Sequence, residues 1–202
     1  MADPGYIVDG VLTDGEAWVG IATNTADGSA LAVSTFTSTD DGQVGDFSQY
    51  MDLVVISYTR LTGTGGGVNS EVKFNLNNNA DTALYVTQQL RGDGADDHAG
   101  VDTADGFGNL CQTPGSGADA EDFGCSVLTL FDINSGKYKS CVSTYASDTD
   151  GAGYTGINAI LWKSQAAITE IDIVNRSGSH ADGSTFSLFG ILPSMLTTGT
   201  LP

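Results

Sequence analysis

The chain has 202 residues and a formal net charge of −18, from 25 acidic and 7 basic residues. A surface this negative repels nucleic-acid phosphates, so the charge excludes direct DNA binding. No apolar run approaches transmembrane length, and the N-terminal MADPGYIVDG lacks the basic and apolar regions of a secretory signal. We therefore expect a protein that is made in a cytoplasm and has neither a nucleic-acid nor a membrane partner.

Short β-branched and aromatic runs alternate with clusters of Gly, Asp, Ser and Asn, and no sustained helical periodicity is present. In one run, Val72, Phe74 and Leu76 alternate with polar residues, as a strand with one wet face requires. Ten strands are predicted, at 16–24, 30–38, 52–62, 69–77, 82–90, 125–133, 137–146, 157–164, 167–175 and 184–191. The pattern predicts an all-β fold, an antiparallel β-sandwich.

The chain divides into an N-terminal arm (1–15), a sandwich (16–191) and a C-terminal extension (192–202). Within the sandwich, residues 91–124 are polar and are predicted to form a long projecting loop, a candidate for a partner contact. Ten side chains are expected to be largely buried: Trp18, Phe36, Val55, Phe74, Leu128, Leu130, Trp162, Ile171, Phe186 and Leu188.

Three cysteines form an odd set without CxxC spacing, so they predict neither a zinc motif nor a disulfide framework. Cys125 and Cys141 lie in apolar runs and are expected to be buried. Cys111 lies in the predicted loop, and the sequence leaves open whether it pairs with either of them.

No catalytic constellation emerges. His98 and His180 are the only histidines, and both are predicted to lie in loops outside any metal-binding pair. Ser179 and Asp182 stand too close to His180 in sequence to give the geometry of a catalytic triad. Because nothing selects two catalytic carboxylates among the 25 acids, we expect no catalysis, no cofactor and no metal site.

Several short matches to functional motifs are explained by turn chemistry or by chance. GAGYTG (151–156) has the letters of a phosphate-binding loop, but the segment after it reads as a strand rather than the required helix. The acidic segments 38–46, 92–102 and 147–158 contain Asp and Gly in turn patterns and lack a complete calcium-ligand series. Arg91-Gly92-Asp93 matches an adhesion tripeptide by coincidence in a chain rich in Gly and Asp.

The C-terminal part carries a more specific signature. Trp162 is followed by a polar spacer, an I-x-x-I-x-I run (168–173), a Gly/Ser turn and then GSTFSLFGI (183–191). Ile171 with Ile173, and Phe186 with Leu188, are expected to share faces of two strands that a hairpin turn connects.

This sequence pattern closely resembles that of a family of tailed-phage virion proteins with jelly-roll domains. The family includes head-decoration (cement), minor structural and tail-fibre proteins. In the N-terminal half, Tyr50 and Leu53 stand at the family's Y-x-x-L region, and the resemblance spans about residues 17–191. It implies a sandwich of jelly-roll type and a role in the virion.

On this basis the chain is expected to be a capsid decoration protein, a homotrimer on the outer capsid surface that stabilises contacts between major capsid subunits. The expected contact is the N-terminal arm through Tyr6, Ile7 and Val8, with the 91–124 loop as the alternative. A second hypothesis is a tail or head fibre protein that binds a host glycan, although the chain shows no fibre shaft and its aromatic residues are scattered. A third, a secreted glycan-active enzyme, lacks a catalytic pair.

Overall fold

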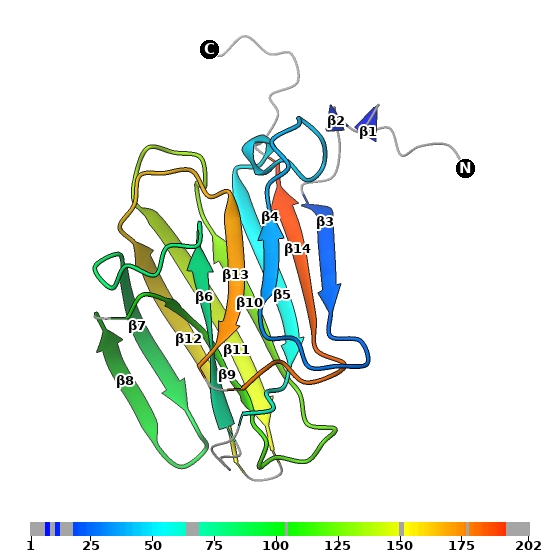
Figure 1. Cartoon of the computed structure of the whole chain (residues 1–202). Helices are drawn as coiled ribbons and strands as arrows, with labels where there is room; N and C mark the ends of the chain where they lie inside the picture. The colour runs from blue at the N-terminus through cyan, green and yellow to red at the C-terminus, as the bar shows by residue number, and fades with distance from the viewer. Residues whose placement is uncertain are drawn as a thin grey trace.

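The computed structural model describes residues 7–8, 11–12, 18–63, 69–103, 105–149, 152–176 and 178–192. Two antiparallel sheets pack face to face, so the fold is the predicted β-sandwich of jelly-roll type (Figure 1). The described helical residues form only the three-residue 3-10 helix η1 (Phe47–Gln49), which is far too short to cross a membrane.

The larger sheet contains eight strands: β3 (Trp18–Thr25), β5 (Asp52–Thr59), β7 (Tyr85–Gly92), β8 (Asp97–Asp102), β10 (Gly124–Leu130), β11 (Lys139–Asp148), β12 (Gly153–Trp162) and β14 (Thr185–Ile191). Their spatial order is β3-β14-β5-β10-β11-β12-β7-β8. The smaller sheet contains β4 (Ser34–Thr37), β6 (Asn69–Leu76), β9 (Gly108–Pro114) and β13 (Glu170–Asn175), in the order β4-β13-β6-β9. The ten predicted strands are all confirmed, with shifted boundaries.

The core lies between the two sheets, where inward-facing Val, Leu, Ile and Phe side chains alternate with outward-facing residues. Nine of the ten predicted core residues are buried there. The prediction for Trp18 is wrong: its side chain is 48% exposed and packs against Phe189 on the outer face. Val19, the next residue, faces the core instead, because alternate strand residues point to opposite faces.

The prediction of a projecting loop at residues 91–124 is also wrong. Strand β8 pairs with β7 in the large sheet, and β9 pairs with β6 in the small sheet. Strand β9 contains no aromatic or β-branched residue except Thr113, so its local sequence gives little strand signal. Burial between the sheets determines its structure: a Cβ on Gly108 would lie 2.4 Å from the Phe74 ring.

The expected hairpin between residues 167–175 and 184–191 is a crossover between the sheets. Strand β13 pairs with β4 and β6, whereas β14 pairs with β3 and β5. The shared faces are confirmed, since Ile171, Ile173, Phe186 and Leu188 are all buried in the core. A turn signal shows where the chain reverses but not which sheet the next strand joins.

The cysteines and histidines differ in part from expectation. All three cysteines are free thiols, and burial raises the pKa of Cys111 and of Cys141 to about 12. Cys111 lies in β9 rather than in a loop, and Cys125 is exposed rather than buried because it faces outward on β10. His98 lies in β8 rather than in a loop.

His180 does lie in a connection, between β13 and β14, but it is fully buried. Its Nε2–H donates to the Ile173 carbonyl (3.3 Å), so Nδ1 is the acceptor facing the Thr59 hydroxyl at 3.2 Å. The Phe186 ring meets the imidazole edge-on at 4.7 Å between centroids. Burial lowers the pKa of His180 to about 4, so the folded protein holds it neutral at physiological pH.

This histidine should make stability depend on pH. The unfolded chain binds a proton at His180 below about pH 6.5, whereas the folded chain resists protonation down to about pH 4. Its contribution to stability is therefore present above pH 6.5 and is lost as the pH falls toward 4, by about 3 kcal/mol. Denaturant unfolding at pH 7 and pH 4 should show a smaller loss in His180→Gln than in the natural chain. Equal losses would contradict the assignment.

The Asp-rich segments behave as turns where they are described. In 38–46, the Asp41 carboxylate accepts a hydrogen bond from the Gln43 N–H, and Asp46 accepts from the N–H groups of Gly42 and Ser48. In 92–102, Asp93 likewise accepts from Ala95 and Asp96 at the β7–β8 turn. Residues 150 and 151 lie outside the described part of the chain.

Candidate functional site

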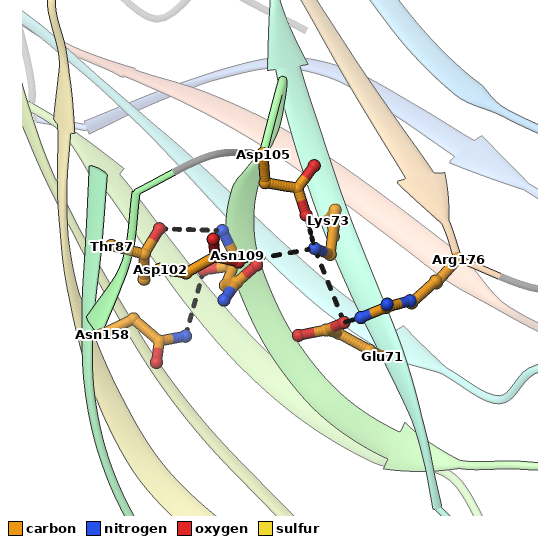
Figure 2. A network of polar contacts seen from close by, with 8 residues as sticks. All are labelled: Glu71, Lys73, Thr87, Asp102, Asp105, Asn109, Asn158 and Arg176. Atoms are coloured by element: carbon orange, nitrogen blue, oxygen red, sulfur yellow. Dashed lines mark hydrogen bonds and ion pairs between the residues drawn. The ribbon is translucent and has the colours of Figure 1, made fainter. Parts of the chain in front are cut away.

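A buried lysine ties the β8–β9 connection to the outer face of β6 (Figure 2). The Lys73 side chain is 5% exposed, and its ammonium donates to Asp105 in that connection. Glu71, on the same strand, lies 3.6 Å from the Lys73 Nζ, and Asp102 at the end of β8 lies at 3.9 Å. Three carboxylates therefore surround one cation, and they hold the segment after β8 against the smaller sheet.

Arg176 extends this ion cluster to the protein surface. It follows β13, and its Nη1 donates to Glu71 Oε2 at 3.1 Å. The pKa of Arg176 is raised, chiefly by this hydrogen bond and then by the Glu71 charge. Glu71 is thus shared between a buried lysine and an exposed arginine, which fixes its position at the edge of a groove.

A second polar group lies between the sheets, where β9 covers β11 and β12 (Figure 2). The Asn158 amide donates to the backbone carbonyls of Asn109 and Leu110 at 3.0 and 3.2 Å. The Asn109 N–H donates to the Thr87 hydroxyl at 3.4 Å. These bonds attach β9 to the larger sheet, although the buried Asn109 side-chain amide has no partner within the described residues.

The groove lies beside the ion cluster, where the larger sheet extends past the smaller one. Strand β9 is the edge of the smaller sheet, and the β7–β8 hairpin overhangs it (Figure 1). The open hollow under the overhang has a volume of about 500 Å³. Its lining is almost entirely polar: Asn69, Ser70, Glu71, Gln89, Arg91, His98, Asp102, Gln112, Tyr154 and Arg176.

Arg91 and Tyr154 form the fixed part of this groove. The Arg91 guanidinium lies over the Tyr154 ring, 5.0 Å from its centroid, in a cation–π arrangement. In the sequence, Arg91 stands out only as part of the Arg-Gly-Asp tripeptide. The groove residues come from five strands and from the residue after β13, and only strand register brings them together.

The opposite surface, the outer face of the larger sheet, carries no charge over most of its width. One row of outward-facing neighbours crosses the sheet: Ser187, Ile56, Val127, Thr144, Ile157, Leu90 and Ala99. The row on one side holds Tyr58, Cys125, Ala146 and Thr155, and the row on the other holds Thr129, Val142, Ala159 and Gln88. We call these fifteen positions the uncharged face.

Much of the uncharged face is apolar. Ile56 lies beside Val127 and Ile157 beside Leu90, with Thr144 between the two pairs, and the four apolar side chains are between 37% and 55% exposed. Exposed apolar residues gathered in this way mark interaction sites in soluble proteins. Tyr58 stacks on Phe123 at one border of the face, with ring centroids 4.9 Å apart. The sequence does not predict this aromatic pair, because the two residues are far apart along the chain.

The residues predicted to bind a partner fall mostly outside the described structure. Tyr6 lies outside it, while Ile7 and Val8 form β1 (Ile7–Val8), which pairs with β2 (Val11–Leu12) in a small hairpin. Of the C-terminal extension, only Leu192 is described, and it packs against the core. No group of three metal-ligating side chains is found within the described part of the chain.

No family model and no curated protein matches the sequence. Among solved structures, the chain is similar to the CBM40 domain of the Ruminococcus gnavus IT-sialidase, a structure bound to α2,6-sialyllactose. The two are 9% identical, with 87% of this chain and 96% of the other covered, and the TM-score is 0.27. A match at this level carries no inference about ligand or activity.

Proposed function

We propose that the chain is a structural protein of a tailed-phage virion, a decoration protein that assembles as a homotrimer on the outer surface of the capsid. It acts by binding the major capsid protein and copies of itself, without catalysis. The uncharged face is the observation that supports self-assembly. The resemblance of residues 162–191 to virion jelly-roll proteins supports a role in the virion.

The charge distribution explains why this face should meet a second copy. Two chains of net charge −18 repel each other over most of their surfaces. The uncharged face is where close approach brings no carboxylates together. A protein with 25 acidic residues that keeps fifteen adjoining sheet positions free of charge is arranged for self-contact there.

The exposed apolar area of this face favours assembly. Full burial of a Val, Leu or Ile side chain contributes about 1.5–3 kcal/mol, and each of the four central residues still exposes 37–55% of its surface. Covering all four therefore contributes about 3–5 kcal/mol per copy, before the flanking rows are counted. In the proposed trimer, one side of this face meets the other side of the same face on the next copy, so a closed ring gives every copy the same contacts.

A carboxylate placed on this face should prevent assembly. In Ile157→Asp, the new charge would be buried against other acidic copies, so we expect the assembly to dissociate to monomers of 20.8 kDa. Sedimentation or native mass measurement of the purified protein reads this directly. Ala166→Asp adds the same charge in an exposed loop at another surface and should leave the trimer intact.

Ile157→Thr provides a second variant that keeps strand propensity and should weaken assembly without adding charge. A natural chain that is monomeric at all concentrations would contradict the proposed interface. So would an Ile157→Asp protein that folds and remains trimeric.

The capsid contact is assigned to the N-terminal arm, through Tyr6, Ile7 and Val8. These residues are an apolar patch in a polar segment. An apolar patch of this kind can pack against an apolar surface of the major capsid protein. On this proposal, the protein is made in the host cytoplasm and is found in the virion.

A further inference from the structure

The groove under the β7–β8 overhang contains polar groups that no other described residue satisfies. Within the described residues, the Arg91 guanidinium has no hydrogen-bond acceptor, and it lies over the Tyr154 ring. The Gln89 and Gln112 amides and the His98 imidazole line the groove without a side-chain hydrogen bond to any described residue. The Asn69 Oδ1 is shielded from water and also lacks a donor in the described structure.

These groups offer both donors and acceptors. Arg91 and Arg176 only donate, Glu71 and the Asn69 carbonyl only accept, and each glutamine amide does both. A sugar hydroxyl also donates and accepts at once, so adjacent hydroxyls complement such a mixed lining. Apolar ligands find little matching surface there, because Tyr154 supplies the main apolar area in the lining.

The balance of charges in the groove favours a neutral ligand over an ionic one. Two arginines face two carboxylates, Glu71 and Asp102, so the groove has no excess of either sign. The surrounding protein carries −18 and repels anions such as phosphates and acidic sugars. The carboxylates that could attract a cation are already bound to Lys73 or Arg176.

The size and openness of the groove also suit a segment of a polymer. Its volume of about 500 Å³ lies within the usual range for ligand sites, about 300–1,000 Å³. It is open to solvent, so a polymer can continue beyond it. Tyr154 holds Arg91 in place, and the Lys73 cluster holds Glu71, so the groove is organised before a ligand arrives.

We infer that this groove binds a neutral saccharide, with the Arg91 fork and the Gln89 and Gln112 amides on adjacent hydroxyls. The function goes beyond capsid decoration. The groove residues of β7 and β8 point to the inner side of the larger sheet, opposite the uncharged face, so self-assembly leaves the groove accessible. A virion surface bearing many such grooves would adhere to neutral glycans through weak repeated contacts.

A glycan array bearing neutral and acidic saccharides tests this inference with the purified protein. We expect binding to one or more neutral glycans. Arg91→Lys keeps the charge but removes the planar fork, and it should weaken that binding by about tenfold or more. Arg60→Lys is the matched control: Arg60 donates to the Ala118 and Asp119 carbonyls away from the groove, and its replacement should leave binding unchanged.

Gln112→Ala provides a second variant in case Arg91→Lys does not fold, and it should weaken the same interaction. Absence of binding to every neutral glycan would overturn the inference, as would binding confined to acidic glycans. Binding that Arg91→Lys and Gln112→Ala both leave unchanged would place the saccharide elsewhere and would equally overturn it. None of these outcomes depends on the virion role, because the array uses the isolated protein.

Discussion

Replacing Trp162 with alanine is expected to lower the free energy of unfolding by about 3–5 kcal/mol. The side chain is 1% exposed and lies at the end of β12, between Lys139 and Tyr85 in strand register. Its removal leaves a cavity in the core between the sheets. Denaturant unfolding monitored by circular dichroism measures the loss.

The matched variant is Trp162→Phe. The indole N–H is buried and has no hydrogen-bond partner among the described residues, so phenylalanine loses no polar contact and fills most of the volume. We expect it to cost only about 1–2 kcal/mol. An alanine variant as stable as the phenylalanine variant would show that Trp162 is not packed as described.

Replacing Lys73 with alanine is expected to cost about 2–4 kcal/mol, the second largest effect. Removing one partner of a buried ion pair typically costs 3–5 kcal/mol, because the other charge is left uncompensated. Here the cost is reduced, since Asp105 and Asp102 are 29% and 35% exposed and retain some contact with water.

Asp105→Asn made together with Lys73→Ala should recover part of this loss, because the double variant removes one of the carboxylate charges left without Lys73. Lys137→Ala is the comparison at the surface: Lys137 pairs with Asp132 at 3.7 Å, with both side chains more than half exposed. That change should cost less than about 1 kcal/mol. Equal costs for Lys73→Ala and Lys137→Ala would contradict the buried cluster.

Much of the fold is readable from the sequence because most strands carry their own signal. Val72, Phe74 and Leu76 alternate with polar residues, and all three are found in the core. Strand β9 was missed because its structure depends on burial against Phe74 and the larger sheet, not on its own residues. The sheet to which β14 belongs was equally hidden, since long-range pairing decides it.

The sequence does contain a signal for the uncharged face, but it is missed when only one face of each strand is expected to be apolar. Residues 52–59 read DLVVISYT, with apolar residues in both phases, as is typical of strands covered on both faces. Ile56 and Tyr58 belong to the second phase. The groove had no comparable signal, because Asn69, Arg91 and Arg176 are adjacent only after the sheets have formed.

We propose that the two surfaces make different kinds of contact. On this proposal, the uncharged face meets other copies of the chain, and the polar groove remains open at the side of the assembly. The net charge of −18 would then repel packaged nucleic acid.

The copy number of the protein in purified phage particles tests the proposed virion role most directly. A decoration protein repeats with the symmetry of the shell, so quantitative mass spectrometry should find on the order of hundreds of copies per particle, in fixed proportion to the major capsid protein. A handful of copies confined to the tail, or absence of the protein from the particle, would contradict the proposal.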